Sequence, residues 1–127
     1  MITINRLDHL VLTVKDLDKT IDFYTRVLGM EKEIFKGSRI ALKYGNQKIN
    51  LHELGNEFEP KAYKVQEGSA DLCFIIDTDI NEAKTYIESL GIKIEEGIVA
   101  RTGARGEIES LYLRDPDMNL IELSNYK

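Results

Sequence analysis

The 127-residue sequence has little of several residue types, and each scarcity excludes a class of protein. A single cysteine, Cys73, excludes an intramolecular disulfide, and its apolar neighbours favour a small hydrophobe over a reactive thiol. No apolar run approaches the roughly 18 residues of a membrane span, and no basic segment leads into an apolar one near the N-terminus. With only 2 prolines and 9 glycines, the chain does not resemble disordered or fibrous proteins. We therefore expect a globular protein of the cytoplasm, with no membrane partner.

The charge balance also limits the partners. The formal net charge is −5, and the sequence has no stripe of lysines and arginines that would replace the counterions of a phosphate backbone. We expect no nucleic acid as a partner. The length suits one domain with an ordinary hydrophobic core, which needs neither disulfides nor a structural metal.

The first half of the sequence alternates between strand and helix patterns. Leu7 to Val14 alternates and predicts a strand, on which His9 is the only strongly polar residue that points inward. Asp16 or Asp18 can cap a helix that ends at Gly29. Three further strands are predicted, separated by turn sequences, at residues 31–35, 39–44 and 48–53.

The second half repeats this order after a long connection. Residues 54–69 contain Gly55, Pro60 and Gly68 and show no clear period, which predicts a long loop of the kind that often serves as a lid. The pattern then restarts with a strand, a helix that ends at Gly91, and three more strands. These are predicted at residues 71–76, 80–90, 92–98, 107–113 and 120–124. Each half therefore reads βαβββ.

The two halves align at fixed offsets. His9 and Asp71 lie 62 positions apart, and Asn50 and Glu122 lie 72 apart. The ten extra residues are most simply placed in a loop around Ala100–Gly106. If a pseudo-twofold axis relates the halves, these four polar residues occupy equivalent positions on otherwise apolar strands.

Glu122 lies in a predicted hairpin from Leu111 to Leu123, which turns at Pro116. Ile121 and Leu123 share one face of the second strand, so Glu122 points the other way. An unpaired carboxylate there would cost several kcal/mol in a dry site, and it therefore needs a partner.

Several motifs resemble the vicinal oxygen chelate superfamily, which includes glyoxalase I, fosfomycin-resistance enzymes, extradiol dioxygenases and bleomycin-binding proteins. They are Asp8-His9-Leu10, the helix Asp16–Tyr24, Leu28-Gly29-Met30 and Asp115–Glu122. The segments Gly45–His52 and Gly68–Ile75 look closest to the glyoxalase-domain-containing protein 5 type. The resemblance covers essentially the whole chain.

The resemblance implies an α+β fold in which two tandem βαβββ modules form an open, eight-stranded, barrel-like cleft. Module one would span residues 5–53, the connecting loop 54–69 and module two 70–127. Members of this size usually form homodimers. Met118 replaces a glycine of the family's turn, so we expect Asn119 to adopt any positive φ there.

The resemblance further implies a divalent metal, Mn²⁺, Ni²⁺, Zn²⁺, Fe²⁺ or Mg²⁺, held by inward residues of the first and last strands of each module. His9 and Glu122 match the family's ligands, whereas Asp71 stands where many members have histidine and Asn50 where glyoxalase I has glutamate. His52 lies on the same face as Asn50, about 7 Å further along the strand, and is a rival ligand. The alternatives are a neutral, hydrogen-bonded His9 and a Glu122 paired with a basic side chain.

Other polar residues are candidates for binding a substrate. Tyr112 and Ser110 share a strand face and should line the cleft, although each could simply fill the core. Asn50 is a further candidate. Arg101 and Arg105 could receive an anionic group, or could belong to a mobile basic loop.

Two classes of function follow. The first is a metal-dependent enzyme, of lyase, isomerase or dioxygenase type, that acts on a small substrate with vicinal oxygens, with Glu122 as the catalytic carboxylate. The second is a metal-free protein that binds and sequesters an antibiotic or metabolite, as bleomycin-binding proteins do. One scaffold supports both, so the sequence does not identify the substrate.

Overall fold

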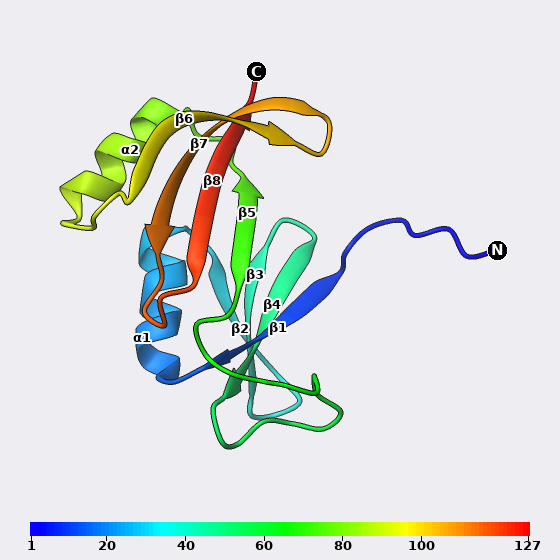
Figure 1. Cartoon of the computed structure of the whole chain (residues 1–127). Coiled ribbons are helices and arrows are strands. Elements are labelled where there is room, and N and C mark those ends of the chain that lie inside the picture. Colours follow the sequence, from blue (N-terminus) through cyan, green and yellow to red (C-terminus); the bar gives the residue numbers. More distant parts are fainter. The chain divides into compact units, whose positions relative to one another are not determined.

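The computed structural model describes residues 1–127 and contains eight strands in two four-stranded sheets (Figure 1). The chain divides into two compact units, Met1–Glu67 and Gly68–Lys127. Each unit holds one βαβββ module, which confirms the predicted α+β class. None of the helices combines the length and apolarity needed to cross a membrane.

The first unit contains one sheet with the strand order β1-β4-β3-β2, in which only β1 and β4 are parallel. Its elements are β1 (His9–Val14), α1 (Leu17–Asp22), η1 (Phe23–Val27), β2 (Glu31–Phe35), β3 (Arg39–Tyr44) and β4 (Gln47–Glu53). The side chain of Asp16 caps α1 by accepting from the Lys19 N–H, as predicted. The sequence pattern did not predict that the second part of the helix, η1, is a π-helix.

The second unit repeats the topology in the order β5-β8-β7-β6. Its elements are β5 (Asp71–Ile75), α2 (Ile80–Ser89), β6 (Glu96–Gly103), β7 (Gly106–Arg114) and β8 (Leu120–Tyr126). Asp79 caps α2, and Gly91, with φ +75°, follows its end. The helix packs against β7 and β8, with its apolar side chains buried.

The strand registers reproduce the internal repeat. In the first sheet His9 lies opposite Lys48, and in the second Asp71 lies opposite Leu120. These pairs differ by the offsets of 62 and 72 found in the sequence. The duplication is therefore structural, and equivalent residues point to equivalent faces.

The β6–β7 hairpin corrects one prediction. A strand was expected at residues 92–98 and a loop at Ala100–Gly106, but β6 starts at Glu96 and continues to Gly103. Only Ala104 and Arg105 form the turn. The reason is tertiary: residues 100–103 pair in register with β7, after an irregularity between Gly97 and Val99.

The turn before β8 corrects a second prediction. Met118, not Asn119, has the positive φ, of 70°. Asn119 is 1% exposed, and its side chain is fixed by donating to Asp115 and accepting from the Ala70 N–H, at 2.8 Å each. The left-handed conformation therefore falls on the exposed Met118.

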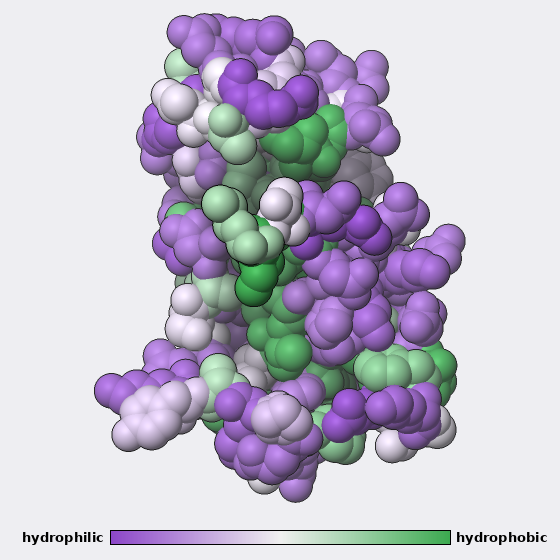
Figure 2. All heavy atoms as spheres, turned by 90° about the vertical axis from the view of Figure 1, so that its right-hand side faces the viewer, coloured by the Kyte–Doolittle hydropathy of each residue, from purple (hydrophilic) through white to green (hydrophobic).

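The apolar core of the second sheet lies on the face opposite Glu122. Leu111 and Ile121 are fully buried there, and Leu123 is 4% exposed. The surface is mixed: in Figure 2 most of the visible residues are hydrophilic, with hydrophobic residues showing between them. Glu122 therefore lies on the opposite face of β8 from its buried apolar neighbours Ile121 and Leu123.

Candidate functional site

A cavity of about 410 Å³ lies on the face of the second sheet that carries Glu122. Strands β5, β6, β7 and β8 all contribute side chains to it. Its lining consists of Cys73, Ile75, Arg101, Thr102, Gly103, Ala104, Ile108, Tyr112, Glu122 and Tyr126. Because the cavity combines apolar walls with converging polar groups, it has the character of a small-molecule site.

Glu122 is held by its neighbours on both sides of the strand. It alternates with the buried Ile121 and Leu123, so its carboxylate points to the cavity face. Across the sheet it lies between Cys73 on β5 and Tyr112 on β7. None of the ion pairs in the structure includes Glu122. The expected alternative, a pairing with lysine or arginine, is therefore absent from the structure.

Tyr112 links this carboxylate to a cation. Its hydroxyl accepts a hydrogen bond from Arg101 Nε at 3.0 Å and also interacts with Glu122. Burial raises the pKa of the phenol, and the negative charge of Glu122 and the hydrogen bond to it raise the pKa further, while Arg101 opposes them. The phenol therefore stays protonated at neutral pH and can donate its proton toward Glu122.

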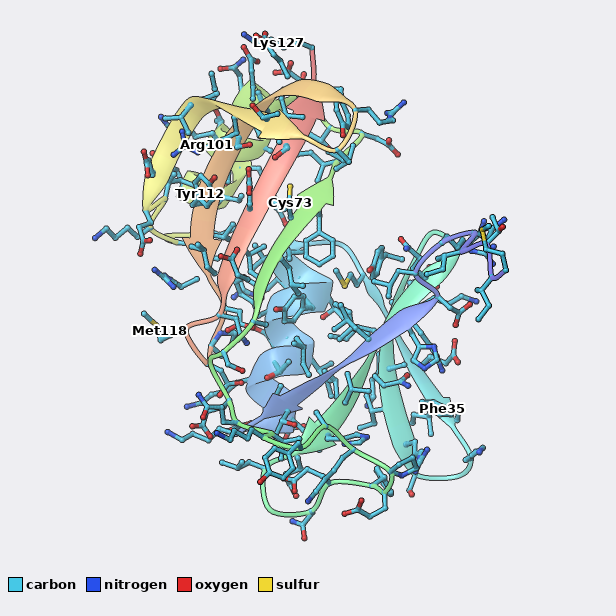
Figure 3. The ribbon with its side chains drawn as sticks, turned by 45° about the vertical axis from the view of Figure 1, so that its right-hand side comes forward. Phe35, Cys73, Arg101, Tyr112, Met118 and Lys127 are labelled. Atoms are coloured by element: carbon cyan, nitrogen blue, oxygen red, sulfur yellow. The ribbon has the colours of Figure 1, made fainter.

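Arg101 lies on β6 rather than in a mobile loop (Figure 3). Besides Tyr112, its guanidinium bonds the Ala100 carbonyl oxygen at 3.0 Å and Glu96 Oε1 at 3.2 Å. The two glycines that flank the Ala104-Arg105 turn were the sequence signal for this hairpin. Arg101 was a predicted candidate, but its place on the sheet face was not predicted.

Hydroxyl and thiol groups extend the polar network behind Glu122. Ser124 Oγ lies 3.5 Å from Glu122 Oε2, 3.4 Å from Cys73 Sγ and 2.7 Å from Ser110 Oγ. Ser110 is fully buried, so its hydroxyl bonds Ser124 and does not line the cavity. Desolvation raises the pKa of the Cys73 thiol, against the hydrogen bond with Ser124, and Glu122 raises it too. The thiol is therefore a poor nucleophile at neutral pH.

In the first unit, His9 is held by the residue before it. Its Nδ1 lies 2.8 Å from Asp8 Oδ2, and its Nε2 makes no hydrogen bond within the chain. The side chain of His9 is 45% exposed. A carboxylate on one ring nitrogen, with the other nitrogen free, is the usual arrangement of a metal-binding histidine. Asp8 was not predicted as this partner, although its adjacency to His9 in the sequence was a signal.

Asn50 and His52 follow on β4, on the same face as His9. Asn50 Oδ1 and His52 Nδ1 are buried without a hydrogen-bond partner. The His52 side chain is 8% exposed, and its ring contacts Phe58 of the connecting segment edge-on, with centroids 5.4 Å apart. Burial lowers the pKa of His52, as does the nearby Arg39. His52 is thus covered, whereas His9 is open.

The two remaining candidates stand further from the cavity. Asp71 is exposed at the start of β5, on the same strand face as Cys73. Arg105 lies in the hairpin turn. Its guanidinium stacks 4.6 Å from the centre of the Tyr126 ring, and its backbone N–H donates a hydrogen bond to the Tyr126 hydroxyl. Neither residue lines the cavity.

The residues fit a divalent metal in part. No group of three or more histidine, cysteine, aspartate or glutamate side chains in the chain lies close enough together to hold a metal ion. Each module nevertheless offers suitable donors: an oriented histidine and an unpartnered buried Asn50 oxygen in one, and a carboxylate without a cationic partner in the other. Oxygen and imidazole donors of this kind suit Mn²⁺, Fe²⁺, Ni²⁺ or Zn²⁺.

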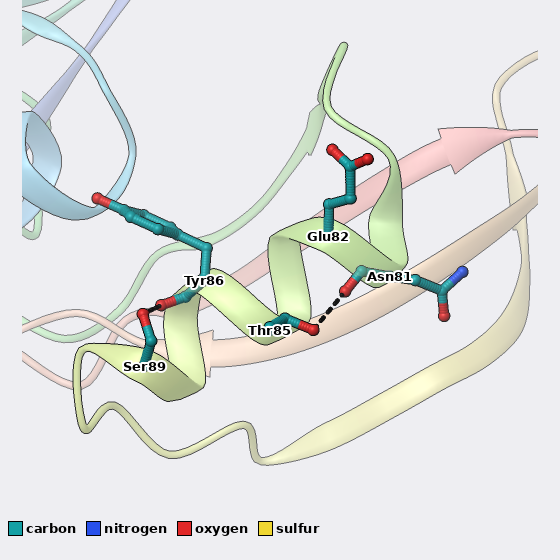
Figure 4. A pocket seen from close by; sticks show the side chains of 5 residues that line it. All are labelled: Asn81, Glu82, Thr85, Tyr86 and Ser89. Carbon is teal, nitrogen blue, oxygen red and sulfur yellow. Dashed lines mark hydrogen bonds between the residues drawn. The ribbon is translucent and has the colours of Figure 1, made fainter.

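A second hollow, of about 440 Å³, lies along the solvent-facing side of α2 (Figure 4). It is lined by Asn81, Glu82, Thr85, Tyr86 and Ser89. The hydroxyls of Thr85 and Ser89 bond carbonyl oxygens of their own helix. This hollow therefore lacks converging polar groups, and the cavity at Glu122 is the better candidate site.

Comparisons with known proteins agree with this geometry. The model of the "Glyoxalase/Bleomycin resistance protein/Dioxygenase superfamily" matches residues 6–123. The chain is 56% identical over 126 residues to the glyoxalase domain-containing protein RDO1 of Mycosarcoma maydis. The alignment covers 99% of this chain and 71% of that protein. The crystal structure of virulence protein STM3117 from Salmonella typhimurium is 57% identical, with a TM-score of 0.98 over 99% of this chain and 100% of that one.

More distant relatives have named activities. A probable lactoylglutathione lyase of Vibrio cholerae is 31% identical over 133 residues, covering 97% of this chain and 92% of that protein. The fosfomycin resistance protein FosX of Listeria monocytogenes, solved with Mn(II) and a dihydroxypropylphosphonic acid, is 26% identical with a TM-score of 0.67 over 98% of this chain and 93% of that one. The antibiotic-binding protein TnmS3 of Streptomyces, at 19% identity and a TM-score of 0.75, covers all of both chains and shares the fold.

Proposed function

Because the chain belongs to the glyoxalase/bleomycin resistance protein/dioxygenase superfamily, we propose that it is a divalent-metal-dependent enzyme. Its substrate would be a small molecule with vicinal oxygens, and its chemistry of lyase, isomerase or dioxygenase type. Within the superfamily, we propose the small glyoxalase-domain-containing protein 5 type. Isomerisation of the glyoxalase kind is the nearest named activity, although Asn50 in place of a glutamate argues against that particular reaction.

Glu122 is the observation that carries this proposal. Its carboxylate faces a cavity, interacts with Tyr112 and has no basic partner. A carboxylate that is partly withdrawn from water without a cation is costly, and a bound divalent ion would remove that cost. His9, with Asp8 on Nδ1 and a free Nε2, is the matching donor of the first module.

The roles of the side chains follow from these contacts. His9 and Glu122 would hold the metal, with Asp71 and His52 as further ligands. When bound, the ion would act as a Lewis acid on the substrate oxygens. Glu122 would accept a proton from the substrate, and the Tyr112 hydroxyl would hold a proton beside it. Asn50, Arg105 and Ser110 complete the proposed substrate-binding set, with Ser110 acting through Ser124 because it is buried.

The relative FosX, which was solved with Mn(II), supports a metal. Mn²⁺, Ni²⁺, Zn²⁺, Fe²⁺ and Mg²⁺ are all candidates for this chain. The set proposed here is richer in oxygen than a histidine-rich site, which favours Mn²⁺ or Mg²⁺.

Metal content tests the proposal. Protein purified without chelator should retain a divalent metal that elemental analysis detects, and a His9→Ala Glu122→Ala double variant should lose it. Glu107→Ala, which removes a glutamate whose side chain is 78% exposed, is the control and should keep the metal. Equal and negligible metal in the wild type and the double variant would refute the proposal.

A metal-free binding protein is the second candidate. The observation that favours it is the lack, within the chain, of three clustered side chains that could hold a metal. The cavity would then sequester an antibiotic or metabolite. This alternative predicts ligand binding that is unchanged by chelator, without turnover of any dicarbonyl compound.

We also propose that the protein is a cytoplasmic homodimer. Its two modules, 5–53 and 70–127, are joined by the loop at 54–69. Each module supplies part of the proposed donor set. Size-exclusion chromatography with light scattering tests the homodimer, because a monomer at micromolar concentration would contradict it.

A further inference from the structure

The internal repeat shows which part of the cavity is peculiar to the second module. Phe35 opposite Arg39 is the last pair of the β2–β3 hairpin, and Val99 opposite Ser110 is the equivalent pair in the second module. The β6–β7 hairpin continues for four further pairs, which accommodate most of the ten extra residues. This extension carries Arg101, and module one has no counterpart of it.

Arg101 folds back over the sheet instead of pointing into water. On its strand it lies opposite Ile108, yet its guanidinium bonds Tyr112 and Glu96, which form a pair further along the same two strands. The side chain therefore lies along the cavity face. Its charge is one tyrosine hydroxyl away from Glu122.

Arg101 has capacity for a further acceptor. A guanidinium has five N–H donors, and three of them are used, on Tyr112, Ala100 and Glu96. The Glu96 side chain is 56% exposed and that of Arg101 40% exposed, so an incoming anion can displace the Glu96 carboxylate into water at small cost. The planar fork suits a carboxylate.

The rest of the cavity limits what accompanies that anion. Ile75 and Ile108 supply apolar walls, and the volume of about 410 Å³ suits only a small molecule. The tip of the hairpin closes against Tyr126: a Cβ on Gly103 would lie 2.8 Å from the Tyr126 hydroxyl oxygen, so this position takes only glycine without rearrangement. The hairpin tip and Tyr126 therefore close the cavity at the end where Gly103 lies.

From this arrangement we infer that the substrate is a small carboxylate with a short apolar segment, whose carboxylate binds Arg101 while its other oxygens face Glu122. Arg101 is therefore the specificity-determining residue of the site, rather than Arg105, whose guanidinium stacks on Tyr126 outside the cavity lining. The inference rests on the proposed function of the same site, but the carboxylate contact itself requires no metal.

The test is an NMR titration of the ¹⁵N-labelled full chain with isobutyrate, and in parallel with its neutral analogue isobutyramide, in buffer that contains a chelator. The amides of Gly103 and Ala104 and the Arg101 Nε–H report on binding. We expect saturable shifts with isobutyrate and none with isobutyramide. Arg101→Gln should weaken isobutyrate binding at least tenfold, because a charge-assisted hydrogen bond is lost.

Matched variants separate recognition from folding. Arg114→Gln removes an equal charge on the neighbouring strand β7, outside the cavity lining, and should leave binding unchanged. Glu96→Gln removes the competing carboxylate and should tighten binding two- to fivefold. Arg101→Lys keeps the charge without the fork and should show intermediate affinity. Equal binding of isobutyrate and isobutyramide, or wild-type affinity in a folded Arg101→Gln protein, would overturn the inference. Because no metal is present, these results are independent of the metal proposal.

Discussion

Arg101 Nε donates a hydrogen bond of 3.0 Å to the hydroxyl of Tyr112, which in turn interacts with the carboxylate of Glu122. The three groups alternate in charge, with a cation, a neutral phenol and an anion. The proposed proton transfer and the proposed placement of the ligand both depend on that order, because the phenol can accept a hydrogen bond from Arg101 while it donates one to Glu122.

The titration of Tyr112 should report this arrangement. In metal-free protein its pKa should lie above 10.0, first because of burial and then because of Glu122. Glu122→Gln should lower this pKa by removing a negative charge, and Arg101→Gln should raise it by removing a positive one. Ultraviolet difference spectra against Tyr112→Phe isolate this phenol from the other five tyrosines. A Tyr112 pKa that neither variant changes would contradict the geometry.

Asp115 should be important for the stability of the second unit. Its carboxylate is 3% exposed and accepts from the Asp117 and Asn119 N–H groups and from the Asn119 side-chain amide. Asp115→Ala leaves these donors without a partner and should lower the free energy of unfolding by about 2 to 4 kcal/mol. Denaturant unfolding measures this loss, with the exposed Glu107→Ala expected within about 0.5 kcal/mol of wild type. Equal effects of the two substitutions would contradict this role.

Two glycines of the β6–β7 hairpin offer a comparison between crowding and backbone strain. Gly97 and Gly106 both have positive φ, of 128° and 141°. A Cβ at Gly97 would lie 2.7 Å from Leu111 Cα, whereas one at Gly106 meets nothing within 4 Å. Gly97→Ala should therefore destabilise the protein by about 1 to 3 kcal/mol more than Gly106→Ala. Equal melting temperatures of the two variants would show that the close approach at Gly97 is absent in solution.

The stability of the protein should depend on pH through His52 of β4, whose ring is covered by Phe58 of the connecting segment. The pKa of His52 is lowered from 6.5, mainly by burial, so below about pH 6.5 the unfolded chain binds a proton that the folded chain does not. The contribution of neutral His52 to the free energy of unfolding is therefore complete above pH 6.5. It is lost as the pH falls from 6.5 through the lower pKa that His52 has in the folded chain. With only two histidines, imidazole NMR signals resolve the titration in chelator-treated protein. His52→Gln should remove this pH dependence and His9→Gln should retain it.

Much of the fold is present in the sequence because it depends on local and periodic signals. Gly29 and Gly91, which end the two helices, and the offsets of 62 and 72 between the halves predicted the repeat. The strand registers of the two sheets confirm it. Strand β6 was misplaced because alternation at residues 92–98 is a local signal, whereas pairing with β7 and the irregularity at Gly97 are tertiary. For the same reason, the sequence did not predict the π-helix η1.

The candidate site was predictable only in part. Alternation alone places Glu122 and Tyr112 on one face of the second sheet, and both side chains line the cavity on that face. The contact of the buried Ser110 with Ser124 depends on the register between β7 and β8. The contact of Arg101 with Tyr112 depends on the length of the β6–β7 hairpin. Such side-chain directions follow from packing among four strands, which no local pattern specifies.

Calorimetric titration of chelator-treated protein with Mn²⁺ tests most directly the proposal that His9 and Glu122 bind one metal ion. We expect one saturable ion-binding process in the wild type, and an affinity at least tenfold weaker in both His9→Ala and Glu122→Ala. The double variant should bind more weakly than either single variant, but its loss of binding free energy should be smaller than the sum of the two single losses, because two ligands of one ion are coupled. Wild-type affinity in either single variant would contradict the claim.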